Sequence, residues 1–114
     1  MRPLSLTLAD AAVQDVFLHT LDCEVTSVCG SIRLRVMRPR ETGERVFLCI
    51  DRTATHDPID SVMLDKAQAA YLRAGIVKAV GSLKIGHSVV LRGVQFAVRE
   101  ANAVAKSLAE FLEE

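Results

Sequence analysis

The alternation of apolar and polar positions predicts a β-hairpin in the first half of the chain. Residues 31–38 and 44–50 each alternate, and the segment 39–43 between them reads PRETG, which is rich in turn-forming residues. A turn at 39–43 sets three apolar positions of the first strand, Ile32, Leu34 and Val36, opposite Ile50, Leu48 and Val46. The other face then pairs Arg33, Arg35 and Met37 with Cys49, Phe47 and Arg45. We therefore expect one core-facing side and one amphipathic, basic side.

Two helices are predicted in the second half. Asp65 is followed three residues later by Gln68, a capping-box arrangement, and Gly81 is a natural stop, so the first helix spans residues 65–80. Apolar residues run almost all the way round this helix, a pattern typical of burial on more than one side. A second, amphipathic helix is expected over residues 98–112.

The remaining segments favour extended structure. Residues 59–64 form a short extended piece, and residues 88–96 are expected to form one strand with Gly93 as a bulge. Leu4, Leu6 and Leu8 alternate as a strand would, residues 9–20 suit either a helix or an approach to a strand, and we favour extended structure over residues 16–28. Together these elements predict a single α+β domain over residues 1–114, a mostly antiparallel sheet of about five strands with two helices packed on one side.

A spacing of 32 residues relates the two predicted strand-to-helix units. It pairs five apolar positions: Val62 with Val94, Leu64 with Phe96, Ala69 with Ala101, Leu72 with Val104, and Ile76 with Leu108. Any strand leading into a helix that packs on a sheet needs apolar residues at such spacings. We favour this general requirement over an internal duplication.

Composition narrows the class of protein. Half of the residues are apolar and 25% are charged, a globular balance, while 14 basic and 14 acidic residues cancel. Whole-chain charge therefore gives no reason to expect binding to nucleic acid, an anionic membrane or an acidic substrate. No apolar run is long enough to cross a bilayer, and three cysteines without a secretory leader make a disulfide framework unexpected. We expect a soluble, cytoplasmic protein.

Two groups of side chains raise the question of metal or catalytic chemistry, although no common catalytic motif is present. His19, Cys23 and Cys29 offer an imidazole and two thiols, but their spacing is not that of a structural zinc site. The loop carrying Asp51, His56, Asp57 and Asp60, with Cys49 upstream, could hold a divalent ion or act as acid and base. We favour core thiols and turn residues in both cases, and expect no metal and no cofactor.

Arginine density is the third feature. Residues 31–52 carry six arginines against three acidic residues, a local charge of +3. Arg33, Arg35 and Arg45 on a strand face beside Phe47 could pair with phosphates while the ring stacks on a base. A solvated outer sheet face explains the same pattern, and we favour it because the whole domain is not basic.

The sequence therefore favours a non-enzymatic interaction module, a small cytoplasmic regulator or inhibitor of bacterial or phage type that binds a protein partner and forms a homodimer. The support is the helix over residues 65–80, which carries more apolar surface than so short a chain can bury, and Tyr71 and Val77 are its expected partner contacts. The alternative is a nucleic-acid-binding protein that uses the hairpin 31–52. A third hypothesis is a small hydrolase or transferase acting through the loop 51–60.

Overall fold

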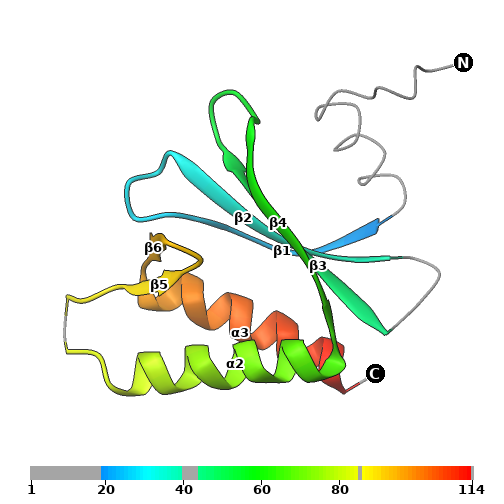
Figure 1. Cartoon of the computed structure of the whole chain (residues 1–114). Coiled ribbons are helices and arrows are strands. Elements are labelled where there is room, and N and C mark those ends of the chain that lie inside the picture. Colours follow the sequence, from blue (N-terminus) through cyan, green and yellow to red (C-terminus); the bar gives the residue numbers. More distant parts are fainter. Residues whose placement is uncertain (1–18, 40–43, 85, 114) are drawn as a thin grey trace, which may run out of the picture.

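The computed structural model describes residues 19–39, 44–84 and 86–113. Four antiparallel strands form a sheet in the order β1 (His19–Thr26), β2 (Ile32–Pro39), β3 (Arg45–Arg52) and β4 (Pro58–Asp65). Helix α2 (Lys66–Gly81), a hairpin of β5 (Val89–Leu91) and β6 (Val94–Phe96), and helix α3 (Val98–Leu112) follow. The two helices lie side by side beneath the sheet (Figure 1). The predicted α+β class is confirmed, whereas the count of about five strands is wrong, because the described residues form six strands in two sheets.

One hydrophobic core joins the sheet to both helices. Alternate positions of β2 and β3 turn inward, as the period of two requires: Leu34, Val36, Val46, Leu48 and Ile50 are at most 2% exposed. Helix α3 buries five apolar residues in this core, including Leu108 and Phe111, whereas α2 buries only Ala69 and Ile76. Helix α3 is therefore the central helix of the domain and α2 is peripheral.

The predicted register of the first hairpin is wrong by two residues. Leu34 lies opposite Ile50 and Val36 opposite Leu48, where the prediction paired Leu34 with Leu48. The reason is Pro39, which ends β2 and pairs with His19 of β1 instead of starting the turn. A proline is tolerated at a strand end because no ladder hydrogen bond needs its missing N–H. A shift of two preserves the faces, so the predicted inward set holds, whereas Met37 of the predicted outward set is only 2% exposed.

The prediction of one strand over residues 88–96 is also wrong. Arg92 and Gly93 have φ angles of 50° and 81°, and they form the two-residue turn that joins β5 to β6. Two consecutive residues with positive φ make the type I′ turn whose twist matches a tight hairpin. Gly93 is therefore a turn residue and not a bulge.

Both predicted helices are present. Asp65 caps α2 by a capping box with Gln68, and α3 spans Val98–Leu112. The predicted stop at Gly81 is wrong by one residue, because α2 includes Gly81 and its C-cap is Ser82. Two pairs of residues related by the spacing of 32 have the same burial. Ala69 and Ala101 are both buried, and so are Ile76 and Leu108. The extended structure expected over residues 16–28 is confirmed in β1, while the predictions for residues 1–18 lie outside the described residues. Among the described helices none has the length and hydropathy needed to cross a membrane.

Candidate interaction surface on helix α2

Helix α2 exposes apolar side chains along most of its length. Tyr71 is 85% exposed and Val77 is 50% exposed, and the small residues Ala70 and Ala74 of the same helix are exposed as well. We refer to these four residues as the α2 face. The helix carries three basic residues, Lys66, Arg73 and Lys78, and no acidic residue. An apolar face of this kind on a helix is typical of a binding surface.

An apolar groove of about 610 Å³ runs beside the α2 face, between α2, β4 and β5. Its deepest lining consists of buried apolar side chains: Leu48, Leu64, Ile76, Val89 and Leu91. Its outer lining includes Tyr71, Gly75, Val90 and Arg92. We refer to this feature as the α2–β4 groove. Its volume lies in the range of about 300–1,000 Å³ that is typical of ligand pockets.

Two polar contacts hold the β5–β6 hairpin in place as one wall of the groove. The Nε of Arg92, at the hairpin turn, donates a hydrogen bond to the carboxylate of Asp60 on β4. This hydrogen bond lowers the pKa of Asp60. The backbone N–H of Val28 donates to the carbonyl oxygen of Gln95 on β6 over 2.9 Å. The hairpin is thus tied both to β4 and to the turn after β1.

The N-terminal end of α2 is held by a capping box and by a contact between Lys66 and Phe111. Gln68 N–H donates to Asp65 Oδ1 over 2.8 Å, and Asp65 N–H donates to Gln68 Oε1 over 2.9 Å. The ammonium group of Lys66 lies 4.3 Å from the centre of the Phe111 ring and donates to the Phe111 carbonyl oxygen. The exposed residues of α2 are therefore carried by a helix that is anchored to the sheet and to α3.

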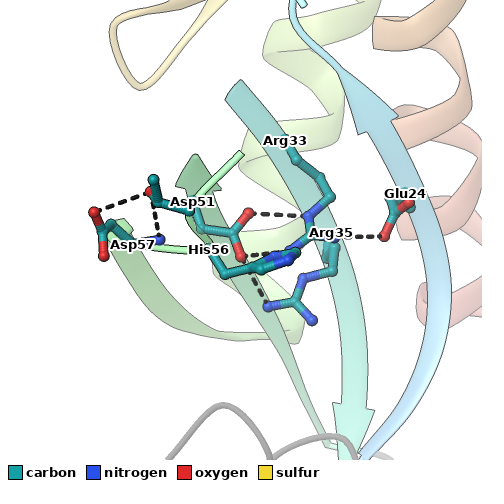
Figure 2. A network of polar contacts seen from close by, with 7 residues as sticks. Glu24, Arg33, Arg35, Asp51, His56 and Asp57 are labelled. Atoms are coloured by element: carbon teal, nitrogen blue, oxygen red, sulfur yellow. Dashed lines mark hydrogen bonds and ion pairs between the residues drawn. The ribbon is translucent and has the colours of Figure 1, made fainter. Parts of the chain in front are cut away.

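A network of polar contacts on the other side of the sheet includes two of the arginines predicted to bind nucleic acid (Figure 2). Asp51, which is 5% exposed, accepts hydrogen bonds from Arg33 Nε over 3.0 Å and from Arg33 Nη2 over 2.7 Å. Arg35 Nη2 donates to the same carboxylate over 3.3 Å. Glu24 lies 3.7 Å from Arg33, and His56 Nδ1 lies 3.1 Å from Arg33 Nη2. The hydrogen bond to Asp51 raises the pKa of Arg33.

This network balances charge within the protein. The guanidinium groups of Arg33 and Arg35 are directed at Asp51, and their side chains are only 19% and 12% exposed. Arg45 is exposed and sits opposite Asp65 on β4, and Phe47 is half-buried opposite Met63. The structure therefore does not gather the four predicted nucleic-acid contacts into one open basic surface. The nucleic-acid hypothesis stays a prediction that no contact among the described residues favours.

The acidic residues predicted to share a loop are divided among three settings. Asp51 belongs to β3 and Asp60 to β4, while Asp57 accepts a hydrogen bond from Thr55 Oγ1 over 2.9 Å within the turn. Arg33 contacts both Asp51 and His56, a link that the sequence pattern did not indicate. Within residues 19–39, 44–84 and 86–113, no three His, Cys, Asp or Glu side chains are grouped to hold a metal ion.

The three cysteines lie in different surroundings. Cys29 is exposed in the turn after β1, where the hydroxyls of Ser31 and Ser27 lie 2.9 and 3.3 Å from its sulfur. These hydrogen bonds, led by Ser27, lower the pKa of Cys29 to about 7. Burial raises the pKa of Cys23, which is half-buried in β1. The side chain of His19 is outside the described residues.

Sequence reasoning identified α2 but missed the groove beside it. The groove's second wall depends on the tight turn at Arg92 and Gly93, and the sequence signals it only weakly, because turns of this type favour Asn-Gly or Asp-Gly over Arg-Gly. Comparison with protein-family models, with curated proteins and with solved structures yields no match to this chain.

Proposed function

We propose that the protein is a non-enzymatic interaction module that presents the α2 face to a protein partner and forms a homodimer through it. The exposure of Tyr71, 85% on a helix that buries only two residues, is the observation that supports this function best. A regulatory or inhibitory role in the cytoplasm of a bacterium or of a phage-infected cell belongs to the same proposal.

The physical argument is the cost of leaving apolar area in water. Burial contributes roughly 25 cal/mol for each Å² of apolar surface, so covering Tyr71 and Val77 together favours association. The small side chains of Ala70 and Ala74 on the same helix would let a partner backbone approach closely. A tyrosine suits this position because its ring can be covered while its hydroxyl stays hydrated. A two-fold contact is the commonest way for identical chains to cover such a face.

Neither rival function has a comparable observation behind it. The guanidinium groups of Arg33 and Arg35 are engaged by Asp51, and the residues of the predicted catalytic loop are held in separate contacts. The nucleic-acid and enzyme hypotheses can be tested by salt-dependent binding of oligonucleotides and by the effect of changing His56 on any turnover.

Static light scattering tests the proposed homodimer. We expect a dimer for the wild-type protein at tens of micromolar and a folded monomer for Val77→Glu, because the charge would be buried in the interface. The matched control is Val28→Glu, which places the same charge at a residue that is 59% exposed and outside α2, and should remain dimeric. A monomeric wild type would contradict the homodimer, and a Val77→Glu protein that unfolds would show that Val77 belongs to the core.

A further inference from the structure

The α2–β4 groove and the side chain of Tyr71 belong to one continuous surface. Tyr71 lies at the border of the groove and is 85% exposed, so its ring projects away from the lining that it helps to form. In a two-fold contact the same patch of both copies meets itself, so a projection and a hollow on that patch can fill each other. Tyr71 and the groove supply such a pair.

Gly75 is a second observation at the same place. A glycine inside a helix costs about 1 kcal/mol relative to alanine, so its presence calls for a reason. Packing among the described residues offers none, because, the local helix backbone aside, none of their atoms lies within 4 Å of the position that a Cβ would occupy on Gly75. Gly75 nevertheless lines the groove, one helical turn from Tyr71. The bare backbone there leaves room for a group from outside the chain.

Charge agrees with an antiparallel arrangement of two α2 helices. If Tyr71 of one copy lies over Gly75 of the other, then Lys78 lies opposite Gln68, within one turn of the carboxylate of Asp65. The described residues offer Lys78 no ion-pair partner within the same chain. The basic C-terminal part of each helix would therefore meet the acidic N-cap of its partner.

From these three observations we infer that the α2–β4 groove binds the Tyr71 ring of a second copy of the chain. Each copy inserts its Tyr71 ring into the groove of the other. This inference rests on the proposed homodimer and adds its geometry. The ring would lie against Leu72 and the apolar groove lining, above Gly75, with its hydroxyl directed toward the solvent edge.

Photo-crosslinking with mixed isotopes tests the inference directly. Tyr71 is replaced by p-benzoyl-phenylalanine in unlabelled protein, which is mixed with an excess of ¹⁵N-labelled wild type and irradiated at tens of micromolar. We expect crosslinks from position 71 to labelled peptides that contain residues 62–64 or 89–92. Crosslinks only to unlabelled peptides of the same chain, or to labelled peptides elsewhere, would overturn the seating of Tyr71 while leaving the homodimer in place.

A matched pair of glycine substitutions gives an independent readout. Gly75→Leu and Gly81→Leu both add a helix-favouring side chain where a Cβ meets nothing within 4 Å, but only Gly75 lines the groove. We expect the dimer dissociation constant to rise by at least about tenfold for Gly75→Leu and to change less than about twofold for Gly81→Leu. Equal effects of the two substitutions would overturn the inference, and a wild type that never dimerises would overturn both it and the proposed homodimer. The crosslinking result stands even if Gly75→Leu does not fold.

Discussion

Asp51 holds Arg33 by two hydrogen bonds, at 3.0 Å from Nε and 2.7 Å from Nη2, across the β2–β3 ladder in which the two residues lie directly opposite each other. Asp51 is 5% exposed and also accepts a hydrogen bond from Arg35. One buried carboxylate thus pairs with two arginines on the same sheet face, and Glu24 supplies a second negative charge 3.7 Å from Arg33 (Figure 2). Arg33 and Arg35 therefore have a structural role, because they pair with the buried carboxylate of Asp51.

Neutralising Asp51 should therefore destabilise the fold. We expect Asp51→Asn to lower the free energy of unfolding by about 2 to 4 kcal/mol, because it removes the buried counter-charge of two partly buried guanidinium groups and leaves only the more exposed Glu24 beside Arg33. Urea denaturation measures this change, with Asp57→Asn in the exposed turn as the control. A loss no larger than that of the control would mean that the arginines are well solvated and open to other ligands.

The hydrophobic core should depend strongly on Leu48. Leu48 is 2% exposed and contributes to the floor of the groove, so Leu48→Ala should cost about 2 to 5 kcal/mol of unfolding free energy. Leu21→Ala is the matched control, since Leu21 is 52% exposed in β1 and should cost less than about 1 kcal/mol. Equal losses in chemical denaturation would contradict the inward orientation of Leu48.

Cys29 should react with alkylating reagents well below the pH that an ordinary thiol needs. Its pKa is lowered to about 7, and the thiolate is the reactive form, so its rate should rise about tenfold from pH 6 to 8 and then level off. Cys23, whose pKa is raised by burial, should react more slowly at every pH. Peptide-resolved mass spectrometry after iodoacetamide treatment measures both rates. A Cys29 rate that still rises several-fold from pH 8 to 9 would contradict the lowered pKa.

Elements with strong local signals could be predicted from the sequence. The capping box of Asp65 and Gln68 is decided by residues three apart, and the amphipathic pattern of α3 faces one core, so both helices were found with nearly correct ends. The register of β2 and β3 depended instead on whether Pro39 pairs with β1, which is a contact distant in sequence. The hairpin was missed because Arg92 adopts a positive φ that is uncommon for its residue type.

In the candidate site, too, the features with local sequence signals were predicted and those that depend on distant contacts were not. The apolar excess of α2 pointed to Tyr71 and Val77, and both are exposed in the structure, although their contact with a partner remains a prediction. The groove could not be predicted, because Leu48, Leu64 and Leu91 come from three strands that meet only in the folded domain. The exposed position of Cys29 between two serine hydroxyls likewise depends on the turn that brings Ser27 and Ser31 together.

The most direct test of the α2 face uses the intrinsic fluorescence of Tyr71, which is the only tyrosine of a chain without tryptophan. Acrylamide quenching of this signal reports the accessibility of Tyr71 alone. If a second copy covers Tyr71, the quenching constant should fall as protein concentration rises from about 1 to about 50 micromolar, and should stay high for Val77→Glu. A wild-type quenching constant that remains at the high value of the dilute protein across this whole range would contradict the account.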